Sequence, residues 1–291
     1  MTGELRMELF GPGMTGLHKA GLAGLWMTLR SFEDDPAAMK ALRSAGGSWI
    51  LSETEVTLRW TGSTEQFFDA LIKQSFRLYK DGLLWLPALG EPSEQTSAVL
   101  NECVLGTFLQ HGKSRKSDAA ANPGGKVVVP VDEDQYIITY HRIREYAHQT
   151  VRVKDARKSQ QIVGWVYPGG AVRHSAYGDT AIEEPLSRFL PLLYSIVGVL
   201  YFVVRGKGRR FGNRTYAVVI PEIADLKAYA DLRKHHAPKS IQDVTVSGPG
   251  EAALRLLVSV ETSRLAKAVG PVACRVVTFG KVAWDKQQKK R

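Results

Sequence analysis

A run of 16 almost wholly apolar residues, 189–204, constrains the fold of this chain more than any other segment. The run is short of the roughly 20 residues that a membrane-spanning helix needs, and Pro191 and Gly198 interrupt it. A buried helix that passes into a buried strand is therefore the better interpretation. The segment 216–220 is again apolar and predicts a partner strand.

The loop 205–214 between these two apolar segments is strongly basic, with five cations, three glycines and no carboxylate. Glycine lets a backbone approach a phosphate closely, arginine forks bind phosphates or guanine edges, and an aromatic ring stacks on or wedges beside a base. A solvated hairpin loop is the plainer alternative. The candidate nucleic-acid contacts here are Arg205, Lys207, Arg209, Arg210, Phe211, Asn213 and Arg214.

The net charge of +10 is concentrated in the later part of the chain. Residues 1–100 carry 9 Lys/Arg and 12 Asp/Glu, whereas residues 101–291 carry 30 and 17. Such an excess attracts nucleic acid or an anionic membrane surface, and the attraction weakens with salt.

Patterns for secretion, metal binding and cofactors are not recognisable in the sequence. The first residues lack the charged and then apolar pattern of a signal peptide, so we expect a cytoplasmic protein of a prokaryote. Cys103 and Cys274 have apolar neighbours and are interpreted as core thiols. The seven histidines lack ligand spacing, and the acidic residues 132–134 indicate a solvated turn more simply than a magnesium site. No metal and no cofactor are expected.

The first hundred residues predict helices around a hairpin. A helix over 15–32 carries Gly21 and Gly24, which indicates close contact with another backbone. Asp35 or Ser31 caps a second helix from Pro36. In the hairpin 49–60 that follows, one face is expected to hold Ile50, Val56, Leu58 and Trp60. Next comes a helix over 65–79 capped by Thr64.

Helices and strands remain mixed along the rest of the chain, without regular βαβ alternation. We predict an α+β fold of helices and mainly antiparallel strands with long basic loops, built as one large domain over 1–291. The further expected elements are strands at 83–86, 127–131, 136–140, 162–167 and 275–284, and helices at 93–110, 223–235 and 250–268.

Three basic segments together favour a nucleic-acid clamp: the loops 111–117, 152–158 and 205–214. The first belongs to the stretch 111–125, which has no large apolar residue, so we expect this stretch to be mobile when unbound. The alternative is that the loops lie on different faces. The candidate contacts outside 205–214 are Lys113, Arg115, Lys116, Lys154, Arg157 and Lys158.

An enzymatic alternative is a metal-independent RNA-processing endonuclease. Such chemistry needs only a base, an acid and a cation that stabilises the phosphorane, and His111 or His174 beside Lys or Arg would supply them. A basic peripheral membrane protein is a third hypothesis. The preferred interpretation has no catalytic residue and no membrane partner.

Three blocks of sequence, 13–25, 109–116 and 164–174, resemble the Cas-eight family of large subunits in type I CRISPR surveillance complexes (Cascade), closest to the Myxococcus-type or subtype I-B branch. The resemblance implies a non-enzymatic subunit with guide RNA, target duplex DNA and other Cascade subunits as partners. Family members sit near the 5′ handle of the guide, recognise the protospacer-adjacent motif and help to open the duplex. By the resemblance, Lys113, Arg115 and Lys116 contact RNA or DNA, as do Arg173 and His174.

The chain departs from this family after the expected strand that ends near Trp284. Family members usually continue into a C-terminal helical bundle that lines the displaced DNA strand. We expect the bundle to be absent here and supplied by a separate small subunit, unless the sequence is a piece of a longer chain.

Overall fold

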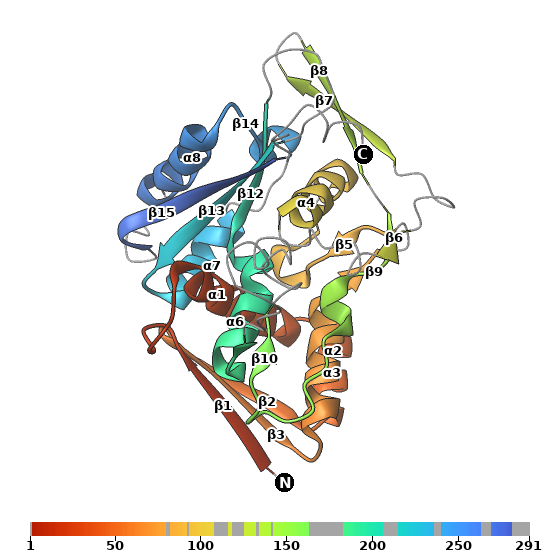
Figure 1. Cartoon of the computed structure of the whole chain (residues 1–291), viewed down its shortest axis with the longest axis vertical. Coiled ribbons are helices and arrows are strands. Elements are labelled where there is room, and N and C mark those ends of the chain that lie inside the picture. The colour runs from red at the N-terminus through yellow and green to blue at the C-terminus, as the bar shows by residue number, and fades with distance from the viewer. Residues whose placement is uncertain are drawn as a thin grey trace, which may run out of the picture.

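The computed structural model describes residues 2–79, 82–91, 93–107, 116–117, 125–131, 134–140, 142–162, 183–205, 215–235, 240–262 and 269–280. Within these ranges, helices and small, mostly antiparallel sheets surround a shared hydrophobic core, which confirms the α+β class (Figure 1).

The longer helices are α1 Gly16–Glu33, α2 Pro36–Ser44, α3 Thr64–Ser75, α4 Glu94–Thr107, α6 Leu186–Gly198, α7 Leu226–His235 and α8 Pro249–Thr262. The 3-10 turns are η1 Pro87–Leu89, η3 Ala147–Thr150 and η4 Ile241–Val244. The strands are β1 Thr2–Glu8, β2 Gly47–Leu51, β3 Glu55–Thr61, β4 Arg77–Leu78, β5 Leu84–Trp85, β6 Lys116–Ser117, β7 Lys126–Val131, β8 Asp134–Thr139, β9 Ile143–Glu145, β10 Gln160–Gln161, β11 Glu183–Glu184, β12 Leu200–Val204, β13 Thr215–Ile223, β14 Thr245–Val246 and β15 Val269–Gly280.

Helices α1 and α6 pack backbone against backbone at the centre of the molecule, and we call this contact the α1/α6 seam (Figure 1). A Cβ atom on Gly21 would lie 1.7 Å from the carbonyl oxygen of Pro191, and one on Gly198 would lie 1.7 Å from that of Ala20. Only glycine permits this approach, which confirms the close contact predicted from the glycines of the first helix. The run 189–204 is the predicted buried helix followed by a strand. Among the described helices, none has the length and hydropathy of a membrane span.

The N-terminal sheet has the order β1-β3-β2 and is antiparallel. Val56, Leu58 and Trp60 point into the core as predicted, but the prediction for Ile50 is wrong, because its side chain is 51% exposed. Ile50 lies opposite Thr57 in the register, so the two share the face of the sheet opposite to Val56, Leu58 and Trp60. On that face Thr57 of the central strand is 5% exposed, whereas Ile50 of the edge strand β2 is open to solvent.

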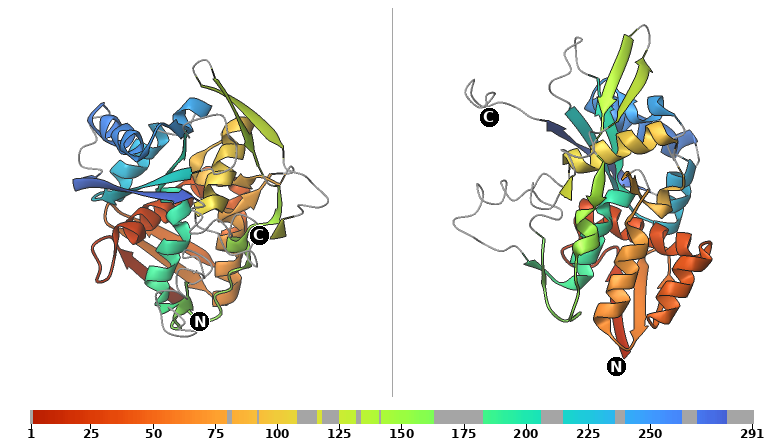
Figure 2. Two further views of the ribbon diagram at one scale, coloured as in Figure 1. Left: turned by 45° about the horizontal axis from the view of Figure 1, so that its top comes forward. Right: turned by 90° about the vertical axis from the view of Figure 1, so that its right-hand side faces the viewer.

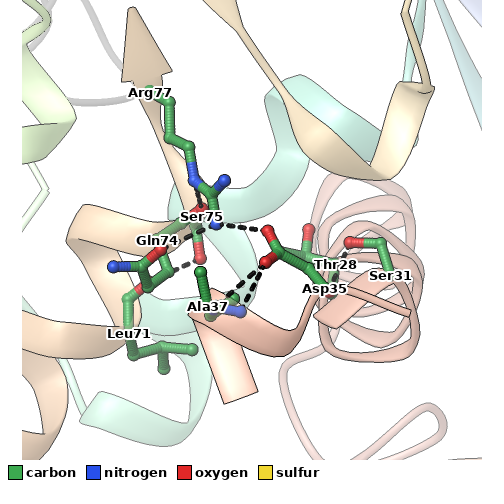
Figure 3. Close-up of polar contacts among 9 residues, drawn as sticks. Thr28, Ser31, Asp35, Ala37, Leu71, Gln74, Ser75 and Arg77 are labelled. Atoms are coloured by element: carbon green, nitrogen blue, oxygen red, sulfur yellow. Dashed lines mark hydrogen bonds and ion pairs between the residues drawn. The ribbon is translucent and has the colours of Figure 1, made fainter. Parts of the chain in front are cut away.

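Helix α2 begins at the cap predicted for it. A carboxylate oxygen of Asp35 accepts hydrogen bonds of 3.0 Å from the backbone N–H groups of Ala37 and Ala38, and the other binds Nη2 of Arg77 at 2.9 Å (Figure 3). Ser31, the alternative cap, donates instead to the carbonyl of Thr28. Asp35 therefore ties the start of α2 to β4.

Helix α3 differs from its prediction at both ends. Its cap is Ser63, whose hydroxyl accepts from the N–H of Gln66, while Thr64 accepts a hydrogen bond from the indole of Trp60. The helix ends at Ser75 because Phe76 adopts an extended conformation and is buried in the core. The helix predicted over 65–79 therefore ends four residues early, and Arg77 and Leu78 form β4 instead.

The second large sheet has the order β14-β12-β13-β15. The antiparallel pairing of β12 with β13 confirms the predicted hairpin, and β14 runs parallel to β12. Residues 223–225 do not join α7 as predicted, since Ile223 pairs with Val269 in the sheet. That pairing also starts β15 earlier than position 275.

The predicted strand 162–167 lies, except for Ile162, outside the described residues, as do positions 132 and 133 of the acidic turn.

The hairpin of β7 and β8 projects from one end of the molecule (Figure 2). The described cysteines fit the core prediction in part: Cys103 is buried, and Cys274 is partly buried, which raises the pKa of its thiol.

Candidate nucleic-acid interface

The described part of loop 205–214 is its root. Strands β12 and β13 end in the pair Val204 and Thr215, so the loop joins adjacent antiparallel strands as predicted. The N–H of Arg205 donates to the carbonyl of Val246 at 2.7 Å, which fixes the root against β14. The other candidate contacts, Lys207, Arg209, Arg210, Phe211, Asn213 and Arg214, lie outside the described residues.

The side chain of Arg205 faces a carboxylate of α8. Its Nη2 lies 3.6 Å from Oε2 of Glu251, and the two side chains are 28% and 30% exposed. Glu251 also binds Arg255, with 2.8 Å between Oε1 and Nη2. The backbone N–H of Ser247 is the largest of the causes that lower the pKa of Glu251 to about 2, so this carboxylate is charged near neutral pH. Within the described part of the root, two arginines therefore lie around the carboxylate of Glu251.

The segment 152–158 presents cations between buried anchors. Val151 and Val153 are buried, whereas Lys154, Arg157 and Lys158 are exposed. Residues 151–154 alternate between buried and exposed, which holds this part of the backbone on the core, and Arg157 and Lys158 follow it on the surface. Arg157 is held locally by Asp155, with 3.2 Å between Nε and Oδ1, and its backbone N–H is the largest cause of the lowered pKa of Asp155.

The loop 111–117 is described only at its end. Lys116 and Ser117 form β6, which pairs with β9, and Lys116 lies opposite Glu145 in the register. Lys113 and Arg115 lie outside the described residues. So do Arg173, His174 and His111, and with them both histidines of the endonuclease hypothesis.

Two other histidines are buried in the described core. His18 is 3% exposed, and its ring Nδ1 lies 2.8 Å from the hydroxyl of Thr15 at the start of α1. His148 is fully buried, with its ring stacked on Tyr146 at 4.6 Å between centroids. Burial lowers the pKa of both, for His148 to about 3. Both are neutral core residues rather than accessible acids or bases.

The segment 152–158 and the root of loop 205–214 lie toward opposite ends of the molecule (Figure 1). The first is followed by β10, which pairs with β11 beside the start of α6. The second begins where β12 ends, and Figure 1 shows α6 and β12 running in the same general direction between the two places. A helix of 13 residues spans about 20 Å and a strand of five about 17 Å. The described parts of the two segments therefore lie at opposite ends of the path that α6 and β12 form (Figure 1).

Sequence reasoning missed Glu251 as a partner of Arg205. Ser247 lies two residues before α8, and its backbone N–H donates to the carboxylate of Glu251 in the first turn at 2.7 Å, a contact local to the helix start. The approach to Arg205 depends on the parallel pairing of β14 with β12, a long-range contact without a local signal.

Comparison with known proteins assigns the chain to a family. Residues 6–193 match the model of the DevT N-terminal domain, which is more than half of the chain, so the protein belongs to that family. Over 305 aligned positions it is 30% identical to the CRISPR-associated protein Cas8a1/Csx13 of Myxococcus xanthus (strain DK1622). The alignment covers 99% of this chain and 51% of the relative, so the chain spans about half of that protein's length. The resemblance to the Cas-eight family is thereby confirmed.

Proposed function

We propose that this protein is a non-enzymatic large subunit of a type I CRISPR Cascade complex. In this role it binds near the 5′ handle of the guide RNA, recognises the protospacer-adjacent motif on target duplex DNA and helps to open the duplex for R-loop formation. Its partners are the guide RNA, the target DNA and the other subunits of the complex. The observation that carries the proposal is the similarity to Cas8a1/Csx13 along 99% of the chain.

The distribution of charge supports a polyanionic partner. Residues 101–291 hold the excess of cations, and loop 205–214 alone contributes five. Its root is fixed between two buried strands, while Lys154, Arg157 and Lys158 point outward elsewhere. A rigid base with cationic loops is suited to phosphate contacts from several elements.

Because the segment 152–158 and the root of loop 205–214 lie apart, we expect them to contact different parts of the nucleic acid. We assign loop 205–214 to the target duplex, because arginine forks and an aromatic ring suit base edges and strand opening. The segment 152–158 then meets a second stretch of phosphate backbone. One helical turn of duplex, about 34 Å, is comparable to the combined length of α6 and β12.

The test is reversal of the loop charges in the full chain. Arg209→Glu, Arg210→Glu and Arg214→Glu together should weaken binding to a duplex that carries the protospacer-adjacent motif, flatten its salt dependence by about 0.9 in log–log slope per lost phosphate contact, and leave complex assembly intact. A matched triple reversal at Lys40, Arg43 and Lys73, all exposed on α2 and α3, should leave duplex binding nearly unchanged.

Three outcomes would contradict the proposal. One is unchanged duplex binding by the loop variant. Another is metal-independent cutting of a labelled repeat RNA by the purified protein, lost in His111→Ala or His174→Ala. The third is co-sedimentation with anionic vesicles in place of nucleic-acid binding.

A further inference from the structure

The carboxylate of Glu251 lies between two arginines, Arg205 and Arg255, at the described root of loop 205–214. Its Oε1 accepts hydrogen bonds from Arg255, at 2.8 Å from Nη2 and 3.2 Å from Nε. Its Oε2 accepts from the backbone N–H and the hydroxyl of Ser247, each at 2.7 Å, and lies 3.6 Å from Nη2 of Arg205. Two guanidinium groups from separate elements therefore share one negative charge.

Phosphate and carboxylate compete for the same groups, because a guanidinium binds either through the same fork of N–H donors. Arg205, Glu251 and Arg255 have side chains that are 28%, 30% and 33% exposed, so solvent and solutes reach all three. Of the two contacts with Glu251, that of Arg205 is the longer, at 3.6 Å against 2.8 Å for Arg255. The longer contact is the one that a phosphate can replace at the lower cost.

Protonation does not release this contact near neutral pH. The pKa of Glu251 is lowered to about 2, first by the backbone N–H of Ser247 and then by its hydroxyl and by Arg255. The carboxylate keeps its charge over the pH range in which nucleic acid binds, so only a competing anion or a substitution changes the balance.

We propose that Glu251 is an internal competitor of nucleic acid, a residue that positions Arg205 against α8 and lowers the affinity of the loop root for a phosphate backbone. This inference rests on the proposed function. When a phosphate reaches the root, Arg205 exchanges the carboxylate for it, whereas Arg255 stays paired with Glu251. Because the contact with Glu251 is lost in the exchange, the net free energy gained on binding is smaller for any duplex. The choice between target and other duplexes then depends on contacts of loop 205–214 other than Arg205.

The experiment measures binding of the full chain to a fluorescent duplex over a range of salt concentrations. Glu251→Gln should tighten binding about fivefold near 0.1 M salt and steepen the log–log salt dependence by about 0.9, the value for one further phosphate contact. Glu65→Gln is the matched control, since Glu65 is exposed in the first turn of α3 and its loss changes the net charge equally. It should bind as the wild type does.

The double variant Arg205→Gln/Glu251→Gln identifies which arginine gains. It should return to the affinity of the Arg205→Gln single variant, because the freed cation is then absent. If Glu251→Gln binds no more tightly than Glu65→Gln, or if the gain survives loss of Arg205, the proposal is wrong.

A measurement on the wild type guards against a folding defect in Glu251→Gln. The arginine Nε–H signals in an NMR spectrum should respond to duplex at Arg205 and remain in place at Arg255. An unperturbed Arg205 signal in the bound state overturns the inference. If the loop reversals weaken binding while Glu251→Gln does not strengthen it, this inference alone fails; if the wild type binds no duplex, the proposed function fails as well.

Discussion

The α1/α6 seam and the start of α8 both place glycine in helical backbone, but the two glycines lie in opposite environments. A Cβ on Gly198 of α6 would meet the carbonyl oxygen of Ala20 at 1.7 Å, whereas a Cβ on Gly250 of α8 would meet none of the described atoms within 4 Å. At the seam, the close approach of the two backbones requires glycine. At the start of α8 the surface is open, and the charges of Arg205, Glu251 and Arg255 determine the contacts.

The largest effect is expected from closing the space at the seam. Gly198→Ala forces two backbones apart, because neither the carbonyl of Ala20 nor the amide of Gly24 can yield as a flexible side chain would. Overpacking of a well-packed core typically destabilises by about 1–3 kcal/mol, and we expect a loss at or above about 3 kcal/mol here. Urea unfolding followed by circular dichroism measures it.

Gly250→Ala is the matched control for that substitution. It adds the same methyl group within a helix where the described structure leaves room, so stability should stay unchanged or rise by up to about 1 kcal/mol. Equal destabilisation by the two substitutions would contradict the difference between the seam and α8.

The second expected effect is on the pH dependence of stability, which differs between the α1/α6 seam and the start of α8. His148 packs against Phe76 near the seam, and desolvation lowers the pKa of its imidazole from 6.5 to about 3. The unfolded chain therefore takes up a proton that the folded chain refuses, and stability falls as the pH drops below about 6.5. At pH 5 the expected loss is about 2 kcal/mol relative to pH 8.

The measurement is the free energy of unfolding at several pH values for the wild type and His148→Phe. The variant should lose the part of the slope between pH 6.5 and 5 that His148 contributes, whereas His18, whose pKa burial also lowers, keeps its own contribution. Glu251 acts in another window, because its pKa is lowered: its stabilising contribution is present above about 4.5 and disappears as the pH falls toward 2. An unchanged slope between pH 6.5 and 5 in His148→Phe would argue against the assignment.

A smaller effect is expected at Asp35, which links α2 to β4 through one carboxylate (Figure 3). Asp35→Ala removes the helix cap and the ion pair with Arg77 and should destabilise by about 1–2 kcal/mol. Asp35→Asn keeps a capping oxygen and should lose less than half of that. Thermal unfolding distinguishes the two, and equal losses would assign the effect to the ion pair.

Much of the fold follows from local patterns in the sequence. The glycines of α1, the apolar run 189–204 and the cap at Asp35 each have a local physical cause, so each was predictable. The errors at Ile50 and Ile223 share one origin: strand register and sheet partners decide on which side a residue lies, and both depend on contacts distant in sequence.

The candidate site was less predictable than the fold. Composition indicates a basic loop, and residue types indicate a polyanion, but neither gives the distance between the loops 152–158 and 205–214. Composition and residue types also do not reveal the carboxylate of Glu251 beside Arg205, because a count of charges within the loop takes no account of residues from other elements. Tertiary pairing of acids with bases determines how much of a sequence's net charge can act on a partner.

The smallest effect is expected on the outer face of α8, where the comparison between core and open surface can be made within one helix. Leu254 is 58% exposed and Leu256 is 1% exposed. Leu254→Ala should change the free energy of unfolding by less than about 0.5 kcal/mol, whereas Leu256→Ala should lower it by about 2–5 kcal/mol. Urea unfolding of the isolated chain measures both. A loss at Leu254 comparable to that at Leu256 would mean that this face is covered in solution, and α8 would then belong with the seam as part of the packed interior.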